Sequence, residues 1–418
     1  MELCHAHSPR LNPLPQAGEE ANESLREFQI NEKIMNKQYD IVIIGGGPVG
    51  SALALALKDS PLRVCVLEAR TAASSDARAL ALSYGSRLLL ERMGVWGKLH
   101  DVSAIRRIHI SQKRSFGRAV LCAEEMNVPE LGYVLPYQIL QDALSRELRN
   151  GAVATIFGAS VTQLAGEIGY ADVGYQLDGV EHTLHARLAV VADGGKLLAQ
   201  RHPPEVRDYG QSALITHVTC AAPQSDTAFE RFTPQGPVAL LPFKDGYELV
   251  WTAPHQHTEK MLAWDEAQFL EELHRHFGDR VGEFLTVGRR SCFPLGLKKA
   301  PRQAPMPHVV LIGNAAQTMH PVAGQGFNMG LRDAWELARE ILDAKPEALG
   351  TDAMLAGYRS ERSTDREAGI RFTDSLVRLF SNDLPLVSAA RAASLTALDC
   401  LPFAKQFVAR RMMFGANG

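Results

Sequence analysis

One uncharged stretch of the chain lies between Asp40 and Lys58, where seventeen residues carry no charge. It begins with the aliphatic run "IVII", continues through a cluster of glycines and a proline, and ends with "SALALAL". The length is at the edge of what a membrane span needs. However, clustered glycines and a proline suit a turn, and short apolar runs on either side suit a strand and a helix. The pattern therefore predicts a buried strand, a tight turn and a buried helix.

Comparable patterns recur along the chain. The segment "LRVCVLEAR" predicts a second strand, which ends at Glu68, and "YQILQDALSRELRN" predicts an amphipathic helix. "TLHARLAVVADGG" and "HVVLIGNAAQ" predict two more apolar strands, each of which ends in glycine or a polar residue. Apolar residues at helical spacing within residues 76–99 predict another helix, and the chain from Arg332 onward is mainly helical in pattern.

These elements predict one α/β domain that is interrupted by strand-rich segments and followed by helices. The predicted α/β segments are residues 38–103, 135–204 and 297–345, and the predicted β-sheet segments are residues 104–134 and 205–296. We expect residues 346–418 to form a C-terminal helical region. Residues 1–37 are rich in charge and lack an apolar pattern, so we expect a disordered N-terminal extension.

Composition excludes several classes of function. The chain has 418 residues and a formal net charge of −3, whereas nucleic-acid-binding domains carry a basic excess. Its six cysteines include no Cys-x-x-Cys pair, so neither a disulfide framework nor a zinc ribbon is predicted. Histidine pairs at i,i+2 spacing, such as His255 and His257, do not share one face of a helix, and we expect no metal site. No signal peptide is visible, so a cytoplasmic protein is expected.

The glycine cluster matches the pattern G-x-G-x-x-G through Gly45, Gly47 and Gly50. It follows a predicted strand, precedes a predicted helix, and is followed eighteen residues after Gly50 by Glu68 at the end of the next strand. This context predicts a dinucleotide site, in which the helix N-terminus binds the pyrophosphate and Glu68 accepts hydrogen bonds from the adenosine ribose. The alternative is a glycine-rich turn without a ligand.

Two later segments narrow the choice between FAD and NAD. The first is Asp193-Gly194 at the end of a predicted strand, and the second is "GNAAQTMHPVAGQGFNMG" at residues 313–330. With the G-x-G-x-x-G pattern they resemble, in the same order, the three motifs of the FAD-dependent aromatic hydroxylases of the para-hydroxybenzoate hydroxylase type. The stretches "DARALALS", "ERFTPQGPVALLPF" and "HPVAGQGFNMGLRDA" resemble the ubiquinone-biosynthesis hydroxylases within that group, and "GNAAQ" resembles the 2-polyprenyl-6-methoxyphenol hydroxylase branch.

The resemblance implies a Rossmann-like FAD-binding domain interleaved with a β-sheet substrate domain, and it adds residues to the predicted cofactor site. Asn314 would bind the ribityl hydroxyls, where the family usually has Asp. The backbone from Gly324 to Asn328 would donate N–H groups to the flavin. The further implied cofactor-binding residues are Arg78, Gln138, Asp193, Pro321, Gly326 and Phe327. A surface ion-pair role is the alternative for Arg78, and a glycine-rich helix cap is the alternative for the stretch as a whole.

The resemblance also implies an activity. NAD(P)H, bound transiently, would reduce FAD, and a flavin C4a-hydroperoxide would transfer one oxygen atom of O₂ to the ring of a polyprenylphenol. Leu241, Phe243 and Pro294 are candidates for the wall of a substrate cavity, or for the core. No catalytic acid or base is identified. The alternatives are hydroxylation at another ring position or of another phenol, and a non-catalytic flavoprotein scaffold among other ubiquinone-biosynthesis proteins.

The C-terminal region carries a further prediction about location. Residues 376–414 are rich in Leu, Phe and Met, and four basic residues accompany them: Arg391, Lys405, Arg410 and Arg411. Basic amphipathic helices lie on anionic bilayers, and a polyprenyl substrate resides in the bilayer. We therefore expect peripheral contact with the inner membrane through this region. The alternative is a helical cap packed on the domain.

Overall fold

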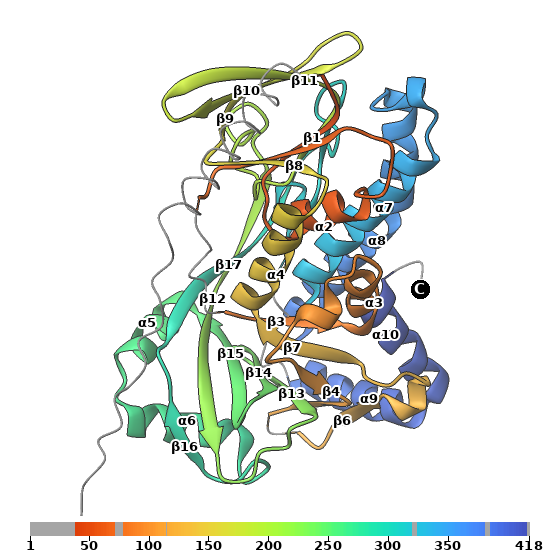
Figure 1. Ribbon diagram of the computed structural model, residues 1–418. Coiled ribbons are helices and arrows are strands. Elements are labelled where there is room, and N and C mark those ends of the chain that lie inside the picture. The colour runs from red at the N-terminus through yellow and green to blue at the C-terminus, as the bar shows by residue number, and fades with distance from the viewer. Residues whose placement is uncertain (1–37, 72–77, 114, 320–323, 381–384, 416–418) are drawn as a thin grey trace, which may run out of the picture. The chain divides into compact units, whose positions relative to one another are not determined.

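The computed structural model describes residues 38–71, 78–113, 115–319, 324–380 and 385–415. The predicted N-terminal extension, residues 1–37, lies outside the described residues. The residues from Tyr39 onward form one unit, which is built around two large sheets (Figure 1).

The first sheet has seven strands, and the predicted first strand lies near its middle. β1 (Tyr39–Ile44) pairs in parallel with β2 (Val64–Glu68) and with β11 (Val180–Val191). All residues of β2 are buried, as is typical of parallel strands that are covered on both faces. The other strands are β8 (Ala154–Phe157), β9 (Ser160–Gly166), β10 (Ala171–Leu177) and β18 (Val309–Leu311).

The second sheet has nine strands, and a third sheet of three strands accompanies it. The nine strands are β5 (Arg107–Gln112), β6 (Arg118–Cys122), β12 (Glu205–Cys220), β13 (Thr227–Thr233), β14 (Gly236–Phe243), β15 (Gly246–Pro254), β16 (Phe284–Val287), β17 (Ser291–Lys299) and β19 (Gln317–Thr318). The small sheet consists of β3 (Ala79–Ser83), β4 (Ser103–Ile105) and β7 (Gly132–Pro136).

Helices pack on both large sheets and form the C-terminal region. They are α2 (Pro48–Ala56), α3 (Tyr84–Arg92), α4 (Tyr137–Asn150), α5 (His255–Ala263), α6 (Glu266–Phe277), α7 (Gln325–Asp343), α8 (Asp352–Phe380), α9 (Pro385–Cys400) and α10 (Pro402–Phe414). α5 and α6 lie on the nine-stranded sheet. α2 lies against α4 and α7 (Figure 1). Leu53, Leu140 and Leu337 of these three helices are fully buried in one apolar core with Ile41 and Ile43 of β1.

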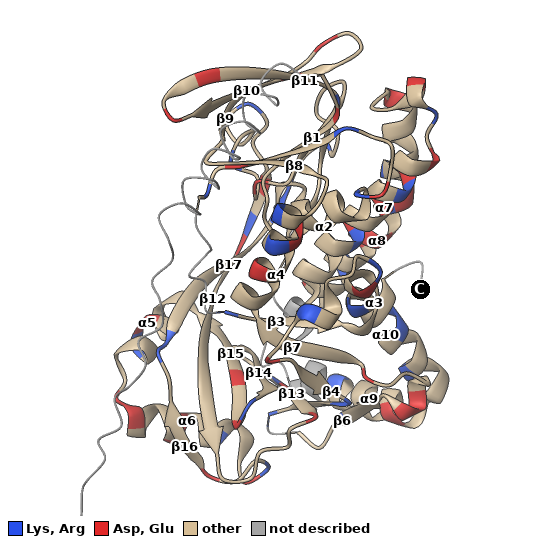
Figure 2. Cartoon of the chain, in the orientation of Figure 1, with Lys and Arg blue, Asp and Glu red and all other residues tan. Residues whose placement is uncertain are grey.

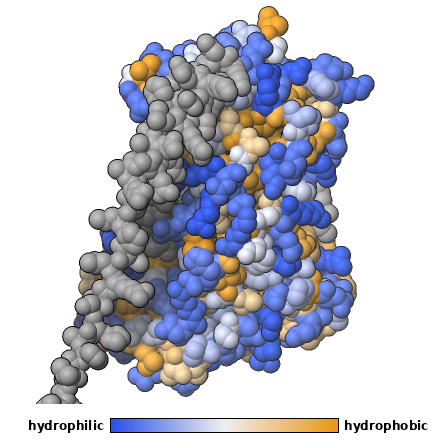
Figure 3. Space-filling model, in the orientation of Figure 1, coloured by the Kyte–Doolittle hydropathy of each residue, from blue (hydrophilic) through white to orange (hydrophobic). Residues whose placement is uncertain are grey.

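The predicted mixed α/β fold with C-terminal helices is confirmed, and the exact domain boundaries stay a prediction. The helix predicted within residues 76–99 is present as α3, but Ala79–Ser83 just before it forms a strand. That segment pairs with β7 in an antiparallel ladder, so a non-local partner decides its conformation. On the face shown in Figure 3, polar residues cover most of the surface and hydrophobic residues are scattered among them.

Candidate functional site

The predicted dinucleotide loop joins β1 to α2 and leaves the start of the helix open. Gly45 has φ of +106°, and a Cβ there would lie 2.7 Å from the carbonyl oxygen of Ala192. A Cβ on Gly50 would lie 2.0 Å from the carbonyl oxygen of Gly45, so only glycine lets helix and loop pack. Gly47 is the N-cap and offers no side chain, and a Cβ on it would meet nothing within 4 Å. Uncapped N–H groups facing open space at a helix start fit a pyrophosphate.

Glu68 lies beside this loop, as the fingerprint predicts. Its Oε2 accepts a hydrogen bond from the Gly46 N–H at 2.6 Å, and its Oε1 accepts one from Arg70 Nε at 2.7 Å. Burial alone would raise the pKa of Glu68, but the hydrogen bonds and charge of Arg70, together with the Gly46 N–H, hold it below its usual value. The carboxylate is therefore ionised at neutral pH, and its remaining lone pairs can accept from ribose hydroxyls.

A buried glutamine that the sequence did not single out also contacts the loop. Gln141 of α4 donates from Nε2 to the carbonyl oxygen of Gly46 at 3.0 Å. Gln138, which was predicted to touch the cofactor, is exposed one turn earlier on the same helix. Its role at the adenine side stays a prediction, whereas Gln141 fixes the backbone of the loop.

The second and third predicted motifs lie against the first. Asp193 accepts hydrogen bonds from the N–H groups of Gly195 at 2.8 Å and Leu197 at 2.7 Å, so its carboxylate shapes its own turn. A Cβ on Gly195 would lie 3.4 Å from the carbonyl oxygen of Asn314, which shows that the two loops touch. The Asn314 side chain is exposed and makes no hydrogen bond with the described residues. It is therefore available to the ribityl hydroxyls, as predicted.

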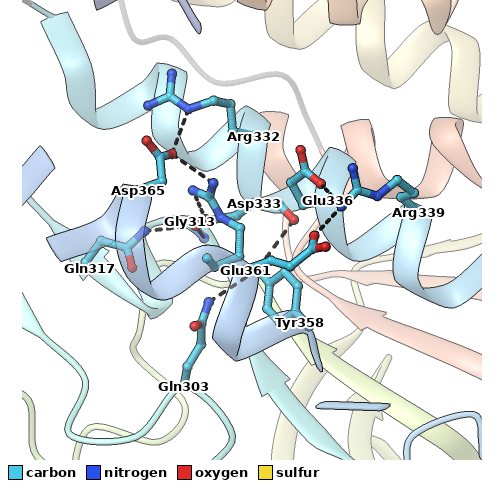
Figure 4. Close-up of polar contacts among 11 residues, drawn as sticks. Gln303, Gly313, Gln317, Arg332, Asp333, Glu336, Arg339, Tyr358, Glu361 and Asp365 are labelled. Carbon is cyan, nitrogen blue, oxygen red and sulfur yellow. Dashed lines mark hydrogen bonds and ion pairs between the residues drawn. The ribbon is translucent and has the colours of Figure 1, made fainter. Parts of the chain in front are cut away.

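A buried ionic network hydrogen-bonds to the loop that carries Asn314 (Figure 4). None of the residues of this network was predicted from the sequence. Asp333 of α7, which is 1% exposed, accepts from the Gly313 N–H at 3.1 Å and from Gln317 Nε2 at 2.8 Å. Its other oxygen contacts Arg362 at 2.7 Å. Arg362 in turn pairs with Asp365, which also pairs with Arg332.

The helix start after this loop has the form expected for a flavin contact. Gly324 is in the left-handed conformation with φ of +61°, and a Cβ there would lie 2.9 Å from Cβ of Ala81. No side chain caps α7, and a Cβ on Gly326 would meet nothing within 4 Å. Free N–H groups at this end favour a partial negative charge in front of them. Pro321 lies outside the described residues.

The prediction for Asn328 concerned its backbone N–H group, and its side chain has a separate structural role. Its Oδ1 accepts from the Ser83 N–H at 2.8 Å and from Ser86 Oγ at 2.7 Å. Its Nδ2 donates to the carbonyl oxygens of Ala81 at 3.0 Å and Gly324 at 2.7 Å. All of its hydrogen-bonding groups are engaged, so it fastens α7 to β3 and α3. A flavin contact through the Asn328 backbone stays a prediction.

A cavity of about 550 Å³ opens in front of these segments. Arg78, Asn314, Gly326 and Phe327 line it, and the guanidinium of Arg78 lies over the ring of Phe293 at 4.9 Å. The nine-stranded sheet forms another wall, and α9 and α10 contribute apolar side chains: Leu395, Leu398, Val408, Met412 and Met413. The volume suits an aromatic ligand with an apolar extension.

The three predicted wall residues do not share one environment. Leu241 lines the cavity. Phe243 is buried in an apolar cluster with Val134, and Pro294 on β17 is exposed. Within the part of the chain that the structure describes, no group of three or more His, Cys, Asp or Glu residues is arranged to hold a metal ion.

Comparisons with known proteins agree with this geometry. The profile of the FAD binding domain family matches residues 38–373. The chain is 34% identical over 397 residues to the ubiquinone hydroxylase UbiL of Rhodospirillum rubrum, covering 90% of each protein. It is 31% identical over 379 residues to the 3-demethoxyubiquinol 3-hydroxylase of Escherichia coli, covering 87% of this chain and 95% of that protein. The solved p-nitrophenol 4-monooxygenase PnpA of Pseudomonas putida has a TM-score of 0.75 at 17% identity, covering 91% of this chain and 99% of that one.

The fold and the site thus define a flavin-dependent monooxygenase that binds FAD. More particularly, the chain belongs to the FAD binding domain family and, within it, to the FAD-dependent hydroxylases of ubiquinone biosynthesis. The resemblance read from the three motifs is confirmed.

Proposed function

We propose that this protein hydroxylates the aromatic ring of a polyprenylphenol in ubiquinone biosynthesis, with 2-polyprenyl-6-methoxyphenol as the favoured substrate. The observation that carries this proposal is the single cavity that runs from the α7 start to the apolar side chains of α9 and α10. A ring placed near Asn314 and Gly326 leaves the prenyl tail among Leu395, Leu398 and Met412. When bound and reduced, FAD would activate O₂ so that one of its oxygen atoms is transferred to the ring.

The residues of the chain would hold FAD at several points. The α2 N-terminus after Gly47 takes the pyrophosphate, Glu68 takes the adenosine ribose, and Asn314 takes the ribityl chain. The open N–H groups at the start of α7 bind the pyrimidine edge of the flavin and favour negative charge on its reduced form. The apolar cavity walls exclude water from the reacting ring.

NAD(P)H is proposed as the electron donor. The glycine pattern at residues 45–50 is the one dinucleotide fingerprint in the sequence, and in this proposal FAD would occupy it. The nicotinamide would therefore bind transiently and leave after it has reduced the flavin.

The names of the relatives do not agree on which ring position is hydroxylated. UbiL carries the general name ubiquinone hydroxylase, whereas the Escherichia coli relative is named for hydroxylation at ring position 3. A shift of the ring in the cavity would change the carbon that faces the flavin, so hydroxylation at another ring position is the alternative. Complementation of bacterial mutants that each lack one ubiquinone hydroxylase tests the assignment. Growth restored only in the mutant that fails to hydroxylate 2-polyprenyl-6-methoxyphenol supports it, and rescue of another mutant alone contradicts it.

We also propose that the protein contacts the membrane through α10. Phe403 and Phe407, here called the α10 aromatic pair, are 71% and 63% exposed and lie one turn apart, with exposed Arg410 nearby. The same helix lines the cavity with Val408 and Met412, so a lipid-dissolved substrate could pass from the bilayer to the site. No helix among the described residues is long and apolar enough to cross a membrane.

The structure changes the set of charges behind this membrane proposal. Arg391 and Lys405, two of the four basic residues predicted to face the bilayer, are buried. Lys405 pairs with Glu125 at 3.0 Å and with Asp399 at 3.3 Å. Contact with other ubiquinone-biosynthesis proteins is proposed from the family resemblance alone.

A further inference from the structure

One carboxyl group faces the apolar cavity from the middle of the nine-stranded sheet. Glu230 of β13 lines the cavity, and its strand neighbours on the same face are Ala228 and Phe232. The pairing register places Ala239 of β14 and Ile110 of β5 directly beside Glu230. The row continues outward to Val250 of β15, Ile215 of β12 and Ala119 of β6. Beyond Ile215 the row reaches Ser291 of β17, so Glu230 is the one charged position in a row of seven across the sheet.

The Glu230 carboxylate has no hydrogen bond or ion pair with the residues that the structure describes. In Figure 2 the strands around β14 are mostly uncharged. Glu230 is partly buried. Removing a carboxylate from water without a protein partner is costly, so its presence in an apolar wall indicates a ligand that can hydrogen-bond to it.

Few other titratable groups face this carboxyl. Arg78 and Tyr137 line the cavity from the cofactor side. On the sheet, Glu248 of β15 is paired with His217 of β12 at 3.1 Å. On α9, Arg391 is buried one turn before Leu395, but it is not among the residues that line the cavity. Burial raises the pKa of Glu230 to about 7, so both of its forms are present at neutral pH.

We propose that Glu230 binds the phenol hydroxyl of the substrate as a hydrogen-bond acceptor and takes its proton during the reaction. This inference rests on the proposed function, because it assumes a phenol in the cavity. The two electrons of NAD(P)H bring O₂ to the peroxide level, and the O–O bond breaks as one oxygen atom forms a C–O bond with the ring. At the same time the phenol O–H bond breaks and its electron pair moves into the ring. The proton passes to the Glu230 carboxylate. The ring then loses H⁺ from the newly oxygenated carbon to the second oxygen atom, which leaves as water, and Glu230 returns its proton to the phenolic oxygen.

The test measures binding without turnover. The oxidised protein loaded with FAD, and its Glu230→Gln variant, are titrated by calorimetry with a short-chain prenylphenol and with the methyl ether of that phenol. The series spans about one pH unit on either side of the Glu230 pKa of about 7. A phenol keeps its proton throughout this range, because phenolic groups titrate near pH 10. The methyl ether matches the phenol in shape but cannot donate a hydrogen bond.

Only the ionised carboxylate offers the stronger, charge-assisted acceptor. We therefore expect the parent protein to bind the phenol about five- to tenfold more tightly at the high-pH end. Binding near neutral pH should also release protons, which appears as a dependence of the binding heat on the ionisation heat of the buffer. The Glu230→Gln variant keeps the size of the side chain and removes its titration. It should retain FAD and bind the phenol with no such pH dependence.

Two results would overturn the inference while leaving the proposed substrate intact. One is an equal pH dependence in the parent protein and in the Glu230→Gln variant, and the other is an equal pH dependence for the phenol and its methyl ether. Failure of both ligands to bind a protein that holds FAD would overturn the substrate class together with this inference.

Discussion

Replacement of Asp333 by Ala should both destabilise the protein and weaken FAD binding. Asp333 is 1% exposed, and its carboxylate accepts hydrogen bonds from the Gly313 N–H and from Gln317. Together with Arg362 it belongs to a buried network whose two carboxylates and two guanidinium groups balance in charge: Asp333, Asp365, Arg332 and Arg362. Removal of Asp333 leaves one buried positive charge uncompensated and frees the loop that carries Asn314.

The magnitude follows from that uncompensated charge. Removing one partner of a buried ion pair costs about 3–5 kcal/mol, whereas exposed pairs contribute about 0–1 kcal/mol. At about 1.4 kcal/mol for each factor of ten, the folding equilibrium should fall roughly 100-fold to several-thousand-fold. Glu361 offers a matched control nearby, because its carboxylate pairs with Arg339 at the surface and is 42% exposed (Figure 4). Glu361→Ala should cost no more than about 1 kcal/mol.

The assay is urea unfolding of the protein without cofactor, followed by titration of each refolded variant with FAD. A double variant, Asp333→Ala with Arg362→Met, removes both charges of the closest pair. It should recover part of the stability lost in Asp333→Ala, because no unpaired buried charge is left behind. Costs that simply add in the double variant, or an Asp333→Ala variant as stable as Glu361→Ala, would refute the argument that this network supports the cofactor loop.

Three further predictions concern the cofactor and the membrane. Gly47→Asp should abolish FAD binding, measured by retained flavin absorbance, because a carboxylate would meet the pyrophosphate. Gly97→Asp, at another glycine with open space, should retain FAD, and equal retention by the two variants would contradict the assignment. Asn314→Leu should lose FAD, because the ribityl hydroxyls are left unpaired, whereas Asn314→Asp should keep FAD with a modestly lower flavin reduction potential. Tight binding of FAD by the Leu variant would show that Asn314 does not face the ribityl chain. Substitution of the α10 aromatic pair by Glu should reduce flotation of the protein with anionic vesicles. The control Ile168→Glu, at a residue that is 98% exposed, should not reduce it. Equal flotation of the parent protein and both variants would exclude docking by α10.

The cofactor loops could be predicted from the sequence because their chemistry is local. Gly45 and Gly50 lie within six residues of each other, and the turn and helix start that they require follow from the absence of Cβ atoms. Asp333 also left a local signal, since it interrupts the apolar row of Met329, Leu337 and Ile341 at helical spacing. A charged residue in such a row indicates a buried partner, although the sequence does not say which.

Other parts of the site depend on partners that are distant in the chain. Gln138 and Gln141 are three residues apart, and only the packing of α4 decides that Gln141 faces the loop. Lys405 seemed free to meet a membrane, but its partner Glu125 lies 280 residues away. Glu230 alternates with Ala228 and Phe232, a pattern that gives one shared face without showing that this face meets a cavity.

The central claim is transfer of an oxygen atom from O₂ to the ring of a prenylphenol. It is tested most directly by incubating the FAD-loaded protein with NAD(P)H and a short-chain 2-prenyl-6-methoxyphenol under O₂ enriched in the heavy isotope, followed by mass spectrometry of the products. The account predicts a hydroxylated phenol that contains one heavy oxygen atom and forms only with protein, NAD(P)H and O₂ together. Consumption of NAD(P)H with no labelled phenol, or a product whose new oxygen comes from water, would contradict it.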